Sequence, residues 1–527
     1  MNPYARRLAL LAILVGSVLV RLPHVSQPMA DSLLAKQAYV ANRARSIARP
    51  PLNPLRSSLD FLDADGARMT FTDEVPVYHT MLAIGYRLAG ERDWVGHALS
   101  LAGSLAAIAA FFALVRREWD DRAAILATVL LSAAPIFIFY GRAVLPEPWM
   151  LAMMLIAAAS YRKYLDEGTK HALVAASLAA MGAGLFKYFG LIVFIPLAEM
   201  ACRKAGSWRG LLSRPFLAML AVAIVPMAAW MGLVFFRTAN PVQSGWVDGR
   251  VMPYFVFQYP SIVLTRGFYA NFFGRFLVRD CGPVMAALVV AGAVAAALRR
   301  RHDTPERGCV RGWTAMGVIY YVLLAPKFRD HDYYELMMLP AAALWATRGL
   351  LAAASRLEVR FAVPARRVVA AALVITIVAH SPWVFGEFFR QDEAKLVLAR
   401  RLDALCPPGA RVVAIGPGIE FPTVIHYSHR EGWPVHSPEL PDDWRTRLDG
   451  FRDSGASLVA VYFDPKATAA QRASYAPLLS ALPVVERRSG LPTRSSGTSD
   501  FVILDLGASR VPDPSQALKE DGGLHRR

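Results

Sequence analysis

The sequence predicts a mainly α-helical fold: a polytopic transmembrane bundle of about eleven spans, with external loops that carry short helices and a small α/β domain near the C-terminus. Composition is the first reason, because 55% of the 527 residues are hydrophobic and 19% are charged, with a mean hydropathy of +0.33. Such a chain is too apolar to be soluble. The second reason is a series of apolar runs long enough to cross a hydrocarbon core of roughly 30 Å. The third is charge, because the 58 Lys and Arg residues gather in short clusters between these runs.

The first apolar run follows a basic N-terminus, as in a signal peptide. No small-residue cleavage site follows before Asp31, so we expect this run to be retained as a span. The runs predict spans at 8–22, 94–115, 123–140, 148–162, 171–186, 189–202, 216–236, 283–298, 312–325, 335–353 and 368–385.

Charge alternates along the loops between these spans. If the N-terminus, with Arg6 and Arg7, is cytoplasmic, every second loop must be cytoplasmic too. Those loops are all basic, and they are 117–122, 161–170, 203–214, 299–311 and 355–367. The opposite short loops hold few Lys or Arg residues, so the pattern agrees with the positive-inside bias and predicts an external C-terminal domain.

Three longer segments then lie outside: 23–93, 237–282 and everything after 386. In the last of them, β-branched runs at 411–418, 457–464 and 501–507 predict strands, and a helical stretch at 392–405 precedes them. We therefore predict a transmembrane domain at 1–385, an α/β domain at 386–507 and a disordered polar tail at 508–527. The Gly-Pro-Gly after the first strand lacks a GxGxxG pattern, which favours an ordinary turn over a phosphate loop.

Other classes are disfavoured by residue spacing. The basic residues form no stripe with interleaved aromatic residues, which argues against nucleic acid as a partner. The four cysteines show no CxxC spacing and no nearby His, so neither a zinc site nor a disulfide framework is indicated. The sequence indicates no cofactor, although it leaves room for a divalent metal.

Charged residues converge on the external ends of the spans. Charges beside a membrane are costly without partners, so a set of them on one side predicts a polar cavity at the outer interface. They are Arg142, Glu147, Lys187, Lys327, Arg329, Asp330, His331 and Asp332. For Lys187 and Lys327, snorkelling to the interface is an alternative.

Acidic residues of the first external loop are further candidates. Asp31 follows the first span, and Asp73 and Glu74 precede Pro76 and an apolar helix. A helix N-cap is the alternative role for Asp31, and a favourable helix-dipole position is the alternative for the other two. If these acidic residues lie beside the basic groups, the basic groups can bind a phosphate. One of the carboxylates can then act as the general base on a hydroxyl group. This combination predicts group transfer from a lipid phosphate.

The order and sidedness of these residues resemble the type C glycosyltransferases, in the branch with the protein O-mannosyltransferases and the lipid A aminoarabinose transferases. The matching features cover most of the chain: an early external Asp, an acidic-x-Pro motif, a span ending in R-x-x-x-P-E, a Lys after the next outward span, and H-x-Y-Y-x-x-x-x-L-P. Here they are Asp31, Glu74 with Pro76, Arg142 with Glu147, Lys187, and His331, Tyr333, Tyr334 and Pro340.

The resemblance implies an inverting transfer of a sugar from a polyprenyl-phosphate donor to an acceptor hydroxyl, at the outer face of a bacterial cytoplasmic membrane. Asp31 would be the catalytic base, and Glu74 would be the carboxylate beside the donor. Donor phosphate would be bound by Arg142, Lys187, Arg329 and His331. The expected substrate-binding residues are Asp73, Tyr78, Glu147, Tyr333 and Tyr334. The acceptor would be a lipid, a polysaccharide or a protein.

Two departures from the family pattern stand out. Many relatives have Asp-Glu and Glu-Lys-Pro where this chain has Asp31-Ser32 and Glu74-Val75-Pro76, so one phosphate or sugar contact lacks its lysine.

A transporter or flippase of an anionic or lipid-linked substrate is the rival interpretation. The absence of an inverted repeat, and the position of the polar residues at helix ends, disfavour it.

Overall fold

The computed structural model describes residues 1–56, 58–63, 66–70, 74–237, 259–298, 309–361, 363–383, 386, 388–416, 423–437, 439–495 and 497–507. The chain forms two compact units. The helical unit is Met1–Gln27 with Thr72–Phe389, and the sheet unit is Pro28–Phe71 with Arg390–Arg527. The sheet unit therefore takes in part of the predicted external loop 23–93. The predicted tail 508–527 and much of the predicted loop 237–282 lie outside the described residues.

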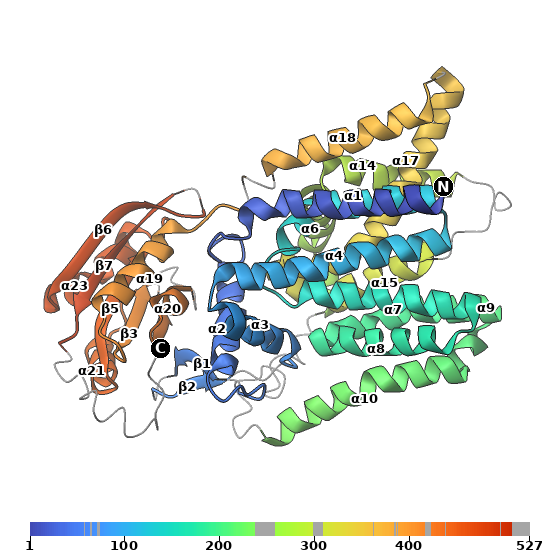
Figure 1. Ribbon diagram of the computed structural model, residues 1–527. Coiled ribbons are helices and arrows are strands. Elements are labelled where there is room, and N and C mark those ends of the chain that lie inside the picture. The colour runs from blue at the N-terminus through green and yellow to red at the C-terminus, as the bar shows by residue number, and fades with distance from the viewer. Residues whose placement is uncertain are drawn as a thin grey trace. The chain divides into compact units, whose positions relative to one another are not determined.

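The helical unit contains long helices joined by short ones (Figure 1). Its first half contains α1 (Pro3–Arg21), η1 (Leu22–His24), α3 (Val77–Ala89), α4 (Asp93–Glu118), α5 (Asp121–Ala133), α6 (Pro135–Tyr140), α7 (Glu147–Glu167), α8 (Lys170–Phe186), η2 (Tyr188–Val193), α9 (Phe194–Ala205), η3 (Trp208–Leu212) and α10 (Arg214–Arg237). Its second half contains α12 (Tyr259–Val263), α13 (Arg266–Ala270), η5 (Asn271–Asp280), α14 (Pro283–Ala297), α15 (Cys309–Leu323), α16 (Ala325–Asp330), η6 (Asp332–Met338), α17 (Leu339–Phe361) and α18 (Ala365–Trp383).

Three helices of the described chain are long and apolar enough to cross a membrane: Asp93–Glu118, Arg214–Leu233 and Asp332–Phe361. The pair Arg266–Asp280 and Pro283–Ala297, bent by 118°, would add a fourth. The eleven predicted spans thus stay a prediction. Some apolar runs are broken into shorter helices, as at Pro135, which has no N–H to continue α5 and instead starts α6.

Helix α7 packs against both α4 and α8, and the three run side by side (Figure 1). The turn between α7 and α8 needs Gly168, whose φ of +67° is in the left-handed region. Helices α14 and α17 cross so closely that a Cβ at Gly292 would collide with Trp345 O, and one at Gly349 with Leu288 O. Close approach through small residues is the packing mode of helices in lipid.

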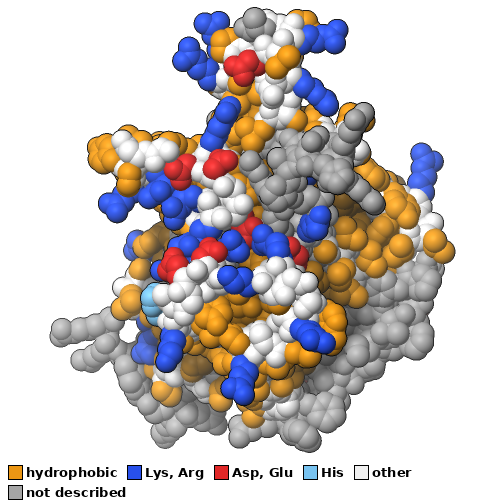
Figure 2. Space-filling view, turned by 90° about the vertical axis from the view of Figure 1, so that its right-hand side faces the viewer, with side chains coloured by type: hydrophobic (Ala, Val, Ile, Leu, Met, Phe, Trp, Pro, Cys, Tyr) orange, Lys and Arg blue, Asp and Glu red, His pale blue; other side chains and the backbone are white. Residues whose placement is uncertain are grey.

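Three of the predicted cytoplasmic loops, 117–122, 161–170 and 203–214, lie together with the N-terminus at one end of the helical unit. Ion pairs join them there: the Met1 amine to Asp121 at 3.3 Å, and Glu118 to Arg162 at 3.1 Å and to Arg203 at 2.8 Å. Figure 2 shows Lys and Arg side chains crowding this end, with acidic side chains among them. The side of the membrane that this end faces stays a prediction.

The sheet unit has seven strands in the order β2-β1-β4-β3-β5-β7-β6. Strands β1, β4, β3 and β5 are parallel neighbours, and β2, β7 and β6 pair antiparallel. The strands are β1 (Ser58–Leu62), β2 (Arg68–Thr70), β3 (Arg411–Gly416), β4 (Gly432–His436), β5 (Ala456–Phe463), β6 (Val484–Pro492) and β7 (Thr498–Asp505). The helices are α2 (Leu34–Ala48), α19 (Glu393–Leu405), α20 (Thr423–Ser428), α21 (Trp444–Asp453), α22 (Ala469–Ser474) and α23 (Ala476–Ala481).

Both faces of this sheet are buried. Successive residues of β3 point to opposite faces, so Val412 packs with α19 and α20 while Val413 packs with α21 and α23. A parallel sheet needs helices on both faces, which explains the apolar runs from which its strands were predicted. The strands predicted at 411–418, 457–464 and 501–507 correspond to β3, β5 and β7, so these strands are confirmed. The predicted domain bounds 386–507 stay a prediction, since the sheet unit also contains Pro28–Phe71.

Candidate functional site

The helical unit buries a lysine at the point where α8 ends. Lys187 has extended backbone, and its Nζ atom lies 2.5 Å from Glu147 Oε1 and 3.4 Å from Glu74 Oε1. Glu147 is the first residue of α7, between two prolines that suit the start of a helix. The side chains of Lys187 and Glu147 are 1% and 0% exposed, so neither charge is at the surface and each depends on the other. Snorkelling, the alternative considered for Lys187, is therefore wrong.

Aromatic rings cover the ammonium group. The Lys187 Nζ atom lies 4.6 Å from the centre of the Tyr334 ring and 5.2 Å from that of Tyr333, which is cation–π geometry. Burial acts to lower the pKa of Lys187, but Glu147 and the other acidic groups around it raise that pKa well above its ordinary value. The His331 ring lies 5.6 Å from the Tyr333 ring and 6.0 Å from the Tyr334 ring. We call these six residues the Lys187 cluster: Glu74, Glu147, Lys187, His331, Tyr333 and Tyr334.

A second set of charges surrounds the same short element, η6. Arg279 donates to Asp332 Oδ2 at 2.5 Å and to Asp280 Oδ1 at 2.6 Å. The Tyr140 hydroxyl donates to the other carboxylate oxygen of Asp332. The Tyr140 and Tyr333 rings are 6.1 Å apart, so this second set adjoins the Lys187 cluster.

Arg275 extends this second set. It donates to Glu335 Oε1 at 2.7 Å and also to the carbonyl of Phe328. Glu335 and Asp280 are both fully buried. Asp332 and Glu335 of η6 thus belong to this second set, and Tyr333 and Tyr334 between them belong to the Lys187 cluster. The short helix η6 therefore connects the two sets.

Sequence reasoning missed Tyr140, Arg275, Arg279, Asp280 and Glu335 as site residues. The signal for the arginines was present, because they stand four residues apart directly before an apolar run, which is the spacing of one helix face. The prediction treated 237–282 only as an external loop, and Tyr140 looked like the end of an apolar span.

Arg142 and Tyr78 are buried but make other contacts. Arg142 Nη1 lies 3.3 Å from the His97 ring nitrogens, and its guanidinium lies 4.6 Å from the Phe389 ring centre. The Tyr78 hydroxyl lies 2.6 Å from Ser100 Oγ, which ties α3 to α4. The roles expected for Arg142 in phosphate binding and Tyr78 in substrate binding stay predictions.

Asp31 belongs to the sheet unit and is fully buried. Its Oδ1 atom accepts a hydrogen bond from Gln37 Nε2 at 2.7 Å. Helix α2 begins at Leu34 with Leu33 as its N-cap and no side-chain capping bond. The alternative interpretation of Asp31 as a helix cap is therefore wrong, and its catalytic role stays a prediction.

The structure describes only some of the remaining predicted site residues. Asp73 and the side chain of Arg329 lie outside the described residues. Glu74 lies two residues before Pro76, the N-cap of α3, and the dipole role considered for it stays an alternative beside its contact with Lys187. In the described part of the chain, no group of three or more His, Cys, Asp or Glu residues could hold a metal ion.

Comparison with known proteins identifies the class of fold. Residues 73–231, which include Glu74, Glu147 and Lys187, match the family of dolichyl-phosphate-mannose-protein mannosyltransferases. The fold is that of the membrane-embedded type C glycosyltransferases, so the resemblance predicted from the sequence is confirmed. None of the curated proteins matches the chain in sequence.

The particular structural relatives are distant in sequence. ArnT from Cupriavidus metallidurans, solved with bound undecaprenyl phosphate, is 15% identical with a TM-score of 0.64, over 95% of this chain and 98% of ArnT. The oligosaccharyltransferase of Archaeoglobus fulgidus is 14% identical with a TM-score of 0.57, over 86% of this chain and 67% of that chain. Mycobacterial arabinofuranosyltransferase AftD is 14% identical with a TM-score of 0.56, over 96% of this chain and 40% of AftD. At these identities the likeness concerns the fold.

Proposed function

We propose that this protein is an inverting glycosyltransferase. It moves a sugar from a polyprenyl-phosphate donor to an acceptor hydroxyl at the outer face of a bacterial cytoplasmic membrane. One observation carries the proposal: a buried ammonium held by two carboxylates, all three groups within the segment that matches mannosyltransferases, and covered by the rings of Tyr333 and Tyr334 from a later part of the chain. The bound undecaprenyl phosphate in ArnT, which has the same fold, supports a polyprenyl phosphate as the carrier.

The unequal distances around Lys187 suggest how a donor phosphate enters. Glu147 holds the ammonium at 2.5 Å, whereas Glu74 lies at 3.4 Å and is the weaker partner. We propose that an incoming phosphate takes the place of Glu74 at Lys187, because a charge-assisted bond to phosphate matches the one it replaces. The released Glu74 carboxylate then accepts hydrogen bonds from hydroxyl groups of the donor sugar.

Further positive charge must accompany the phosphate, since among the described side chains around η6 the carboxylates outnumber the cations. Arg329 and His331 are the predicted sources, because they directly precede η6. Arg279 is a third source, since it already bridges two carboxylates beside Tyr140.

The chemical step follows from the family resemblance. The acceptor hydroxyl gives its proton to the Asp31 carboxylate while its oxygen forms a bond to the anomeric carbon of the sugar. The bond from that carbon to the phosphate oxygen breaks on the opposite face. Polyprenyl phosphate leaves with the bonding electron pair, and the anomeric configuration inverts.

Purified protein, incubated with synthetic polyprenyl-phosphate sugars and an envelope lipid extract, tests the proposal. Mass spectrometry should detect a new glycoside together with free polyprenyl phosphate, and Lys187→Met should abolish both signals. Lys187→Arg keeps the charge but not the compact shape, and should retain partial activity. Donor that crosses vesicle membranes intact, with no glycoside from any donor and acceptor offered, would favour the flippase interpretation instead.

A further inference from the structure

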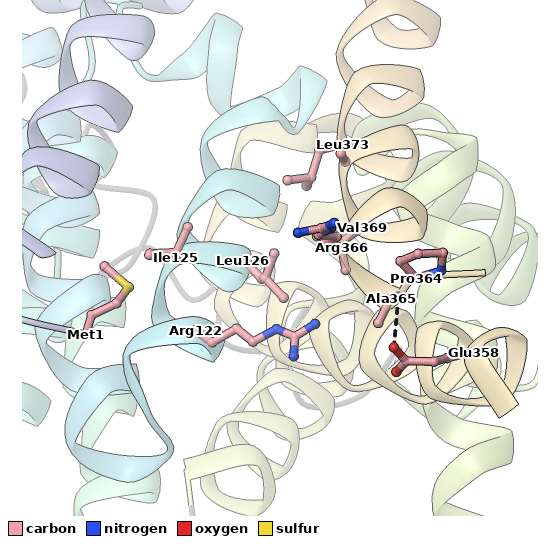
Figure 3. Close-up of a pocket in the computed structure, with 11 residues that line it drawn as sticks. Met1, Arg122, Ile125, Leu126, Glu358, Pro364, Ala365, Arg366, Val369 and Leu373 are labelled. Carbon is pink, nitrogen blue, oxygen red and sulfur yellow. Dashed lines mark hydrogen bonds between the residues drawn. The ribbon is translucent and has the colours of Figure 1, made fainter. Parts of the chain in front are cut away.

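A groove opens in the helical unit far from the Lys187 cluster. Its volume is about 700 Å³, and it lies where α5 and α18 begin and α17 has ended (Figure 3). Helices α5 and α6 run from this groove to Tyr140, at the opposite end of the unit. The walls formed by α5 and α18 contain Arg122, Ile125, Leu126, Arg366, Val369 and Leu373.

The lining changes character along the helix axes. Arg122 and Arg366 are each the second residue of their helix, and Figure 3 shows both side chains extending into the space between α5 and α18. The apolar residues follow along the same two helices. Leu373, seven positions after Arg366, lies about 10 Å further along α18 at 1.5 Å per residue. A charged end level with the helix termini and an apolar end within the bundle match a lipid head group followed by its chain.

The charge at the polar end is positive on balance. Two guanidinium groups line the groove with one carboxylate, that of Glu358, and its Oε1 atom lies 3.5 Å from the backbone N–H of Ala365. Helix α18 begins here, and its first N–H groups add partial positive charge at the same end. Two guanidinium groups at one site suit a phosphodiester, because each can donate two parallel hydrogen bonds to it.

We propose that this groove binds an anionic phospholipid. The phosphate lies between Arg122 and Arg366, and an acyl chain lies along Leu126, Val369 and Leu373. The loops that carry the groove are among those predicted to be cytoplasmic, so the lipid belongs to the inner leaflet. This site is separate from the donor site at the Lys187 cluster.

The test uses the purified full-length protein in detergent and native mass spectrometry. Dioleoyl phosphatidylglycerol and dioleoyl phosphatidylcholine are added in parallel, since they share acyl chains and differ in head-group charge. We expect phosphatidylglycerol to bind at least about tenfold more tightly than phosphatidylcholine, because two basic residues lie near the head group. The double variant Arg122→Gln/Arg366→Gln should lose this preference and bind both lipids alike.

A matched control removes two exposed positive charges from another loop at the same end: Lys204→Gln/Arg209→Gln. It should keep the preference for phosphatidylglycerol. Ala370 lines the groove and is exposed, so Ala370→Trp places an indole there and should weaken the binding of both lipids. Equal binding of the two lipids by the parent protein would overturn the proposal. So would an unchanged preference in the Arg122→Gln/Arg366→Gln variant, or an equal loss in the control variant.

Discussion

Replacing Lys187 with Met removes the positive charge from a buried site and leaves its two carboxylates. Glu147 is fully buried and Glu74 is 5% exposed, so neither carboxylate can turn to water in place. Removing one partner of a buried ion pair costs about 3–5 kcal/mol, because the remaining charge has no compensation. We expect Lys187→Met to lower the free energy of unfolding by this amount at neutral pH.

Protonation supplies a second readout. Without Lys187, the carboxylates of Glu147 and Glu74 are buried with no compensating charge from this lysine, and protonation removes their charge. The stability difference between parent and variant should therefore shrink on acidification.

Unfolding in mixed micelles, followed by tryptophan fluorescence at several pH values, measures both effects. The double variant Lys187→Met/Glu147→Gln should recover most of the lost stability. Arg117→Met is the control: it breaks the half-exposed pair with Glu167 at 2.9 Å, and such pairs contribute about 0–1 kcal/mol. The reasoning fails if Lys187→Met costs no more than the control, or if Glu147→Gln rescues nothing.

Three further predictions concern other parts of the molecule. Asp31→Asn should leave the unfolding transition unchanged and lower sugar transfer about a hundredfold, and near-normal turnover would exclude Asp31 as the base. Gly349→Leu should lower the unfolding free energy by about 1–3 kcal/mol, because the side chain meets Leu288 O, whereas Gly232→Leu, with open space around its Cβ position, should cost less. The sheet unit should lose stability in acid, as hydrogen exchange against pH can show. Burial, and then Arg45, hold the pKa of His426 well below 6.5, so stability falls as the pH drops through 6.5 and the unfolded chain binds a proton. Burial raises the pKa of Asp60, but neighbouring arginines lower it on balance, which adds a loss below about 3.8, and a flat pH profile would contradict both assignments.

The sequence was informative where one physical rule dominates. Glu74, Glu147 and Lys187 could be predicted to converge, because a charge at a membrane-facing helix end requires a partner. Their convergence did not reveal which of them bond directly. The strands β3 and β5 were predictable because a parallel sheet covered on both faces requires nearly continuous apolar runs.

Non-local pairings were not predictable in the same way. The segment of β1 is short and polar at one end, and its parallel partner Gly432 is far along the chain from Phe61. No local pattern encodes such a pairing. Arg275 and Arg279 have a local signal in their four-residue spacing, but their pairing with Glu335 and Asp332 was not predictable, because these partners come from another part of the chain.

The segment that carries Asp31 depends on residues made much later during synthesis. Met29 N–H donates to Tyr427 Oη at 2.6 Å, Ala30 O accepts from Asp392 N at 2.7 Å, and Ser32 Oγ accepts from Arg494 Nη2 at 2.6 Å. Arg494 lies 462 positions after Ser32, which a ribosome covers in about 20–90 s at 5–20 residues per second. Over that interval the helical unit can insert and assemble while residues 28–32 still lack these contacts. A nascent or truncated chain would therefore have its buried lysine site before the Asp31 segment is fixed, because the residues that fix this segment are translated last.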